Sequence, residues 1–115
     1  PARKPAAGYA CLSRETQRRI QALPTDDRWN ARAIKLDLAA ATAVYSNVRD
    51  SLETTLPIEA SGDFAIGFNV DYVRDLTRHF GTIKIEASNA TDAAHVLTED
   101  PDLTVVLMPM RWCDG

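Results

Sequence analysis

Two short segments alternate strictly between apolar and polar residues, and each lies downstream of a segment with the spacing of an amphipathic helix. They are residues 34–38 (IKLDL) and 82–86 (TIKIE). Side chains along a strand point alternately to its two faces, so each segment predicts a strand with one buried face. That face needs a cover, and the two helices are the available cover. The pattern therefore predicts an α+β fold in which helices pack on sheets.

The two predicted helices span residues 14–23 and 70–80, and each has a good N-cap residue directly before it. Ser13 precedes the first helix and Asn69 the second, and both side chains can accept a hydrogen bond from a free backbone N–H of the first turn. The apolar side of the first helix is thin and consists of Thr16, Ile20 and Leu23. The apolar side of the second consists of Val70, Val73, Leu76 and Phe80. Each helix thus has a defined start and a face to bury.

The remaining apolar runs predict further short strands, at residues 9–12, 42–45, 52–58, 64–68, 95–98 and 103–108. Turns are expected at residues 46–47 and 61–63, and Pro57 marks its strand as an edge strand. Each half of the chain then runs strand, helix, strand, strand, strand. This weak internal duplication predicts a pseudo-symmetric domain with both helices on one side of antiparallel sheets.

Length and composition fit one globular domain. With 115 residues, of which 45% are hydrophobic, the chain can bury a core of its own. We expect a flexible lead-in at residues 1–8, the domain at 9–112 and a tail at 113–115. No apolar run is long enough to cross a bilayer, and no signal peptide is recognisable, so we expect a cytoplasmic protein without membrane contact. The sequence does not begin with Met, so it can be a piece of a longer protein.

The residues that carry catalysis in other proteins form no recognisable constellation here. Cys11 and Cys113 lie near opposite ends and form no C-x-x-C pair, which argues for a reducing compartment and against a zinc site or a disulfide framework. A bridge between the two cysteines stays possible. His79 and His95 have no Cys, Ser or paired carboxylate at a catalytic spacing. We therefore expect a protein that is not an enzyme and holds no cofactor or metal.

The last apolar run has an unusual ending. Residues 103–112 read LTVVLMPMRW, so that Met108 and Met110 flank Pro109. Proline cannot donate to a strand ladder and belongs at a strand end. Methionine side chains are flexible and suit a surface that receives several apolar partners. Two interpretations are open: a last core strand followed by a frayed tail, or an exposed apolar pocket for a peptide.

Two segments resemble the third, C-terminal domain of the bacterial DNA polymerase III beta subunit, the sliding clamp. They are residues 66–73 (IGFNVDYV), which lead into the second helix, and residues 105–111 (VVLMPMR), which form the closing strand. The resemblance covers nearly all of the chain, from about residue 9 to residue 112. It implies the DNA-clamp domain fold, a duplicated β-α-β-β-β arrangement.

The resemblance also implies two surfaces. One is a pocket for the short apolar motifs by which polymerases, the clamp loader and repair proteins hold the clamp; its residues here would be Asn69, Tyr72, His95, Val106, Met108, Pro109, Met110 and Arg111. The other is a basic surface for non-specific contact with duplex DNA, formed by Arg14, Arg18, Arg74 and Arg78. Arginines one helical turn apart are equally typical of an ordinary solvated face, and this alternative stays open.

The sequence departs from a complete clamp in two respects. The first and second clamp domains are absent, although the family's pocket is shared between the second and third domains. Trp112 and the residues after it also extend past the family's usual ending. The resemblance further implies that the strand at residues 52–58 and the first helix meet another clamp domain or a second copy. A freestanding module that competes for clamp-binding motifs, or pairs with a clamp, is the alternative to a piece of a ring.

Overall fold

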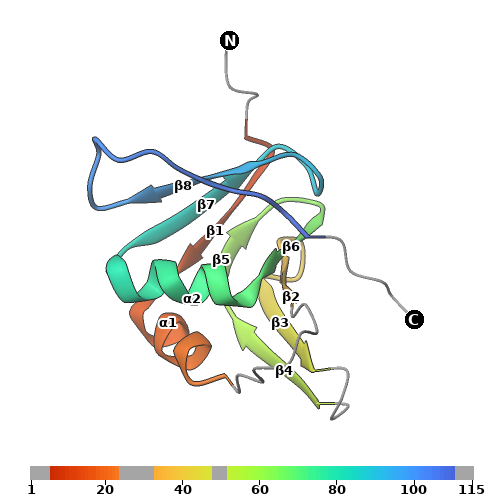
Figure 1. Cartoon of the computed structure of the whole chain (residues 1–115). Helices are drawn as coiled ribbons and strands as arrows, with labels where there is room; N and C mark the ends of the chain where they lie inside the picture. Colours follow the sequence, from red (N-terminus) through yellow and green to blue (C-terminus); the bar gives the residue numbers. More distant parts are fainter. Residues whose placement is uncertain (1–5, 24–32, 48–51, 111–115) are drawn as a thin grey trace.

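The computed structural model describes residues 6–23, 33–47 and 52–110, and these residues form two helices and nine strands (Figure 1). In chain order the elements are β1 (Gly8–Leu12), α1 (Arg14–Gln21), β2 (Ala33–Asp37), β3 (Thr42–Asn47), β4 (Leu52–Pro57), β5 (Glu59–Ser61), β6 (Ala65–Asn69), α2 (Val70–His79), β7 (Ile83–Ala87), β8 (Ala94–Thr98) and β9 (Val105–Leu107). Both predicted helices and all the predicted strands are present, most with ends shifted by one or two residues.

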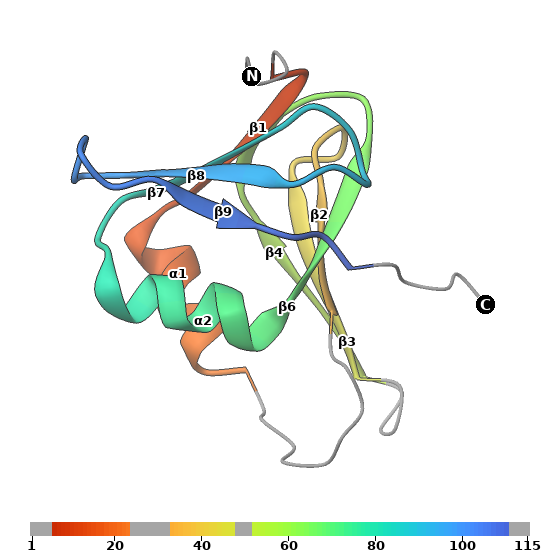
Figure 2. The ribbon, with the colours of Figure 1, turned by 45° about the horizontal axis from the view of Figure 1, so that its top comes forward.

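The strands form two antiparallel sheets. One has five strands in the order β5-β1-β7-β8-β9, and the other has four in the order β4-β3-β2-β6. The helices α1 and α2 contact each other and lie together on one side of the sheets (Figure 2). The predicted α+β class, with both helices on one side of antiparallel sheets, is confirmed.

The two halves of the chain are interlocked because each contributes its first strand to the sheet of the other half. β1 pairs with β7, and β6 pairs with β2. On its other side β1 pairs with β5, a strand of its own half. β6 has an equivalent contact with its own half, since Gly67 forms an isolated bridge with Met110. Each sheet therefore contains strands from both halves, and the described residues form one domain with one core.

The core joins both sheets and both helices, and the two alternating segments supply much of it. Ile34 and Leu36 of β2 are fully buried, and Ile83 and Ile85 of β7 are buried, while the lysine and acidic residues between and after them are partly exposed. Ile20 of α1 packs into the same cluster. The period-2 pattern therefore placed these strands correctly, because burial alternates along them as the sequence does.

Both predicted N-caps are confirmed by hydrogen bonds. The Ser13 hydroxyl accepts the Thr16 N–H at 3.2 Å, and the Asn69 amide oxygen accepts the Asp71 N–H at 2.8 Å. α1 also buries a polar residue that the apolar pattern did not identify. Gln17 donates through Nε2 to the Leu12 carbonyl at 2.8 Å and to the Gly81 carbonyl at 3.0 Å. The thin apolar face of α1 is thus supplemented by polar contacts to β1 and to the turn before β7.

Of the two predicted turns, that at residues 46–47 is wrong, and that at residues 61–63 begins one residue later than predicted. Residues 46–47 do not turn the chain but continue β3, with Ser46 opposite Glu53 and Asn47 opposite Leu52. A ladder pairs backbone groups, so polar residues can extend a hairpin beyond its apolar part. Ser61 belongs to β5 and not to a turn.

The strand predicted at residues 52–58 is followed at once by β5, because the chain leaves the four-stranded sheet at Ile58 and joins the other sheet at Glu59. Pro57 ends β4, an edge strand as predicted.

Candidate functional site

The closing strand β9 lies at the edge of the five-stranded sheet and exposes apolar side chains. Leu107 is buried in the core, whereas Val106 is 51% exposed and Met108 is 64% exposed. In a strand, neighbouring side chains point to opposite faces, so the buried Leu107 turns Val106 and Met108 outward. Only one of the three residues is therefore a core residue, and the sulfur-bearing Met108 is accessible.

The chain beyond β9 crosses from one sheet to the other. The Met110 N–H donates to the Gly67 carbonyl at 2.6 Å, which joins residue 110 to the free edge of β6. Pro109, which has no N–H to donate, lies between the two pairings and is half-buried. Because Gly67 lies two residues before Asn69, the bridge brings the closing segment beside the start of α2.

The start of α2 and the strand β8 contribute other members of the predicted pocket. Asn69 caps the helix, and Tyr72 in its first turn is 59% exposed. His95 of β8 lies opposite Val106 in the register and is half-buried. We name as the C-terminal patch the predicted pocket residues that the structure describes: Asn69, Tyr72, His95, Val106, Met108, Pro109 and Met110. Arg111 and Trp112 lie outside the described residues.

A second surface is the groove between the two helices. It has a volume of about 260 Å³, and its charged lining residues are Arg14 and Arg18 of α1 and Arg78 of α2, with His79 beside them. The three arginine side chains are exposed. Arg78 forms an ion pair with Asp75 at 3.3 Å, but both side chains are more than half exposed, and such pairs are weak. We name Arg14, Arg18, Arg78 and His79 the basic groove.

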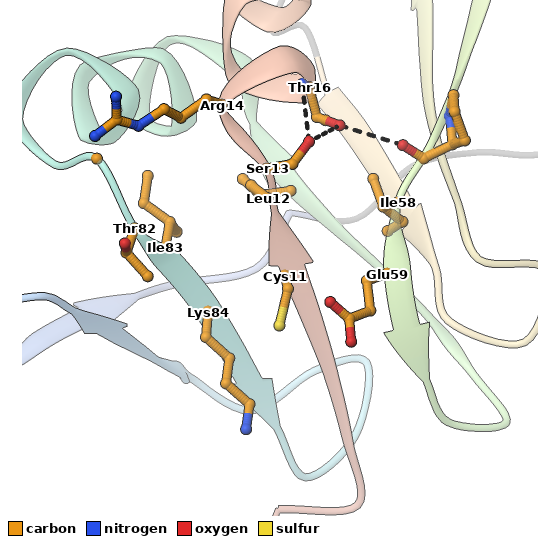
Figure 3. A pocket seen from close by; sticks show the side chains of 12 residues that line it. Cys11, Leu12, Ser13, Arg14, Thr16, Ile58, Glu59, Thr82, Ile83 and Lys84 are labelled. Atoms are coloured by element: carbon orange, nitrogen blue, oxygen red, sulfur yellow. Dashed lines mark hydrogen bonds between the residues drawn. The ribbon is translucent and has the colours of Figure 1, made fainter.

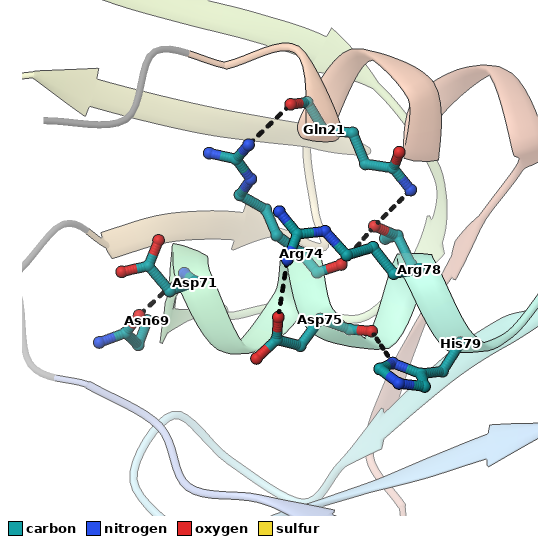
Figure 4. Close-up of polar contacts among 8 residues, drawn as sticks. Gln21, Asn69, Asp71, Arg74, Asp75, Arg78 and His79 are labelled. Atoms are coloured by element: carbon teal, nitrogen blue, oxygen red, sulfur yellow. Dashed lines mark hydrogen bonds and ion pairs between the residues drawn. The ribbon is translucent and has the colours of Figure 1, made fainter. Parts of the chain in front are cut away.

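Arg74, the fourth predicted DNA contact, lies apart from this groove. Its guanidinium donates to the Gln21 carbonyl at 2.8 Å (Figure 4). It also donates to the Leu23 carbonyl at 3.3 Å. Gln21 is the last residue of α1, and Leu23 directly follows its C-cap, Ala22. Within the described part of the chain, Arg74 thus joins the two helices, whereas Arg78, one turn further along, faces solvent.

Sequence reasoning missed a pocket of about 590 Å³ beside the start of α1. Its apolar lining includes Leu12, Ile58 and Ile83 (Figure 3). Cys11 lies between Lys84 and Glu59, as the strand register requires. Burial raises the pKa of the Cys11 thiol, Glu59 raises it further, and Lys84 opposes the rise. A thiol of this kind stays protonated at neutral pH and is a poor nucleophile.

The described residues offer few groups for other chemistry. Among residues 6–23, 33–47 and 52–110, no group of three or more His, Cys, Asp or Glu could hold a metal ion. In the same part of the chain, neither helix is long and apolar enough to cross a membrane. The surfaces that remain are therefore the C-terminal patch, the basic groove and the pocket beside α1.

No protein-family model and no curated protein matches the sequence. The fold, however, matches solved structures throughout its length. The beta sliding clamp of Bartonella birtlesii aligns with a TM-score of 0.76 and 22% identity over 96% of this chain and 34% of the clamp. The clamp of Caulobacter crescentus aligns at 0.74 and 20% identity over 97% and 31%. The Pseudomonas aeruginosa clamp bound to griselimycin aligns at 0.71 and 24% identity over 96% and 32%.

The chain spans about a third of the length of each of these clamps. Its two helices, its two antiparallel sheets and its internal duplication are all accounted for by this likeness. We conclude that the chain has the fold of one domain of the bacterial DNA polymerase III beta subunit, the sliding clamp.

Proposed function

We propose that this chain acts as the third, C-terminal type of sliding-clamp domain, which holds replication proteins by a short apolar motif and supports processive DNA synthesis in a ring around DNA. The observation that carries the proposal is the exposure of Met108 and Val106 beside the start of α2, on a fold shared with sliding clamps. The domain has no catalytic part in this proposal, and its place of action is the cytoplasm.

The C-terminal patch has the chemistry of a site for apolar peptide side chains. Met108, Val106 and Tyr72 are each more than half exposed, so a bound motif would remove a large apolar area from water. Full burial of one large apolar side chain is worth about 1.5–3 kcal/mol. Three such anchors give at most about 9 kcal/mol, and the cost of ordering the peptide removes several kcal/mol of this, which leaves dissociation constants on the order of 100 micromolar. Affinity in this range lets partners exchange.

The DNA part of the proposal assigns the basic side chains of α1 and α2 to contact with phosphates. The chain has a net charge of −3, yet Arg14, Arg18 and Arg78 line one groove between the helices. Phosphate contacts release counterions and carry no sequence information, so such binding would weaken steeply with salt. A ring that slides needs this kind of contact.

A second candidate is a freestanding clamp-like module that competes for clamp-binding motifs or pairs with a clamp. The observation that supports it is that the described residues share one hydrophobic core. Molecular mass in solution distinguishes the two. Self-association, or a requirement for further clamp domains, supports the ring, and a stable monomer that still binds motif peptide supports the module.

The peptide assignment is tested with a fluorescent peptide that carries the apolar anchors of a clamp-binding motif, titrated by fluorescence anisotropy. We expect binding with a dissociation constant on the order of 100 micromolar that is lost in Met108→Glu, because a carboxylate would have to be buried without a partner. The matched control is Leu103→Glu, which introduces the same charge at a residue that is also exposed and apolar but lies outside the patch. Unchanged affinity in Met108→Glu would contradict the assignment.

A further inference from the structure

Arg74 and Arg78 are identical residues one turn apart on α2, yet their surroundings differ sharply (Figure 4). Arg74 is half-buried, and its two terminal nitrogens donate to the carbonyls of Gln21 and Leu23. Its Nε is buried and has no hydrogen-bond partner among the described residues. Arg78 is exposed and reaches only Asp75 of its own helix among these residues. The two side chains are therefore suited to different tasks.

The acceptors of Arg74 are the last carbonyl of α1, that of Gln21, and the carbonyl of Leu23 directly after the helix C-cap. The last carbonyls of a helix have no partner within the helix and carry the negative end of its dipole. The planar guanidinium holds its N–H donors in a fixed fork, so it can donate to two carbonyls at once. The ammonium group of a lysine is a compact point charge and has no such fork. Arg74 of α2 thus supplies hydrogen-bond donors to the carbonyls at the C-terminal end of α1.

Polar contacts of this kind matter for α1 because the helix is short and its apolar face is thin. Within α1, Ile20 is the only described hydrophobic residue that is fully buried. Gln17 ties the middle of the helix to the Leu12 and Gly81 carbonyls. At the other end, Gln21 donates to the Thr77 hydroxyl at 3.1 Å, and Thr77 donates to the Arg74 carbonyl at 2.7 Å. The end of α1 is thus fixed to α2 by a continuous set of contacts around Arg74.

The position of α1 decides where Arg14 and Arg18 stand relative to Arg78, since these residues come from opposite sides of the basic groove. We propose that Arg74 is a positioning residue: it holds α1 against α2 so that the basic groove can take a phosphate group of the DNA backbone, and it makes no phosphate contact itself. This proposal rests on the proposed function of the groove. It reduces the arginines that contact phosphate from the four expected from the sequence to three, Arg14, Arg18 and Arg78.

The test compares Arg74→Met and Arg74→Lys with the matched pair Arg78→Met and Arg78→Lys in the full chain. The first readout is the affinity for a fluorescent DNA duplex of arbitrary sequence at several salt concentrations, well below the melting temperature of every variant. We expect Arg78→Met to reduce the slope of log affinity against log salt by about 0.9, and Arg78→Lys to restore it. Arg74→Met is expected to lower affinity several-fold at an unchanged slope. Arg74→Lys should not restore affinity, because it keeps the charge but loses the fork.

The second readout is the amide NMR spectrum of the free protein, which needs no DNA. A positioning role predicts that Arg74→Met shifts amide signals along α1 as far as Arg14 and Arg18, whereas Arg78→Met shifts signals of α2 alone. A fall in the salt slope of Arg74→Met that Arg74→Lys restores would make Arg74 a phosphate contact and overturn the proposal. An unchanged affinity, or an unshifted α1, would leave Arg74 with a purely local role and would overturn it as well.

The same two measurements separate a failure of the proposed DNA-binding function from a failure of the positioning role of Arg74. If the wild-type chain shows no salt-dependent DNA binding, the assignment of the groove to DNA fails. The amide shifts of α1 would still decide whether Arg74 sets the position of that helix.

Discussion

Replacement of Gln17 by Met should destabilise the domain far more than the exposure pattern of α1 suggests. The substitution keeps the length of the side chain but removes the two hydrogen bonds to the Leu12 and Gly81 carbonyls, at 2.8 and 3.0 Å. Two such bonds are worth about 1–3 kcal/mol net. The bond to Leu12 is buried, and a buried carbonyl without a donor costs about 1 kcal/mol more. Burial of the apolar Met side chain stabilises the fold by about 1 kcal/mol and offsets the cost of the unpaired carbonyl.

The expected loss in the free energy of unfolding is therefore about 2 kcal/mol, which corresponds to a fall in Tm on the order of 8 °C. Urea unfolding followed by circular dichroism measures the first quantity, and a thermal melt measures the second. The comparison variant is Gln21→Met, the same change one turn further along α1 at an exposed residue that makes one side-chain hydrogen bond, to the Thr77 hydroxyl; it should cost about 0.5–1 kcal/mol, clearly less than Gln17→Met. Equal stability of the two variants would refute the reasoning that Gln17 ties α1 to its neighbours.

Three further predictions concern other parts of the fold. The backbone N–H groups of Glu99 itself, Thr82 and Gly81, with the charge of Arg14, hold the pKa of the Glu99 carboxyl below its ordinary value. The stabilisation is therefore present above the ordinary pKa and is lost as pH falls through the lowered one, so the Tm difference between wild type and Glu99→Gln should shrink below pH about 4. Gly8→Ala should lower stability by about 1–3 kcal/mol in urea unfolding, since an added Cβ would meet Leu38 Cδ1 at 2.6 Å and the Ser61 carbonyl at 2.9 Å; an unchanged midpoint would contradict the tight packing there. Asn69→Ala should cost about 1 kcal/mol in the same assay, and Asn69→Ser should restore most of it as a cap; equal losses would show that the cap contributes little.

Local patterns in the sequence were sufficient for most secondary structure. Alternation at residues 34–38 and 82–86 and the caps Ser13 and Asn69 each depend on neighbouring residues alone, and the structure confirms all four. The order of the strands in two sheets depends on contacts between distant segments. The exchange of β1 and β6 between the halves could therefore not be predicted from periodicity, although the duplication itself could. The passage at Ile58 from one sheet to the other has no local signal.

The site was predicted unevenly for a similar reason. Pro109 between two methionines left open whether the closing segment is buried or exposed, and Met108 is exposed. Charge and a spacing of one turn grouped Arg74 with Arg78 on one polar face, but Arg74 lies closer to the buried side of α2. Arg74 follows the buried Val70 by four residues and precedes the buried Thr77 by three, so it lies on the edge of the buried face. That spacing was visible in the sequence, but its carbonyl partners on α1 were not.

Peptide binding at the C-terminal patch is tested most directly by an NMR titration of the isotope-labelled chain with a clamp-binding motif peptide. We predict that the signals that shift belong to residues 69–72, His95 and residues 105–110, and that Met108→Glu abolishes these shifts. Shifts centred on Cys11, Ile58 and Ile83, which line the pocket beside α1, would contradict this prediction. An unchanged spectrum at a peptide concentration on the order of 1 mM, well above the expected dissociation constant, would contradict it as well.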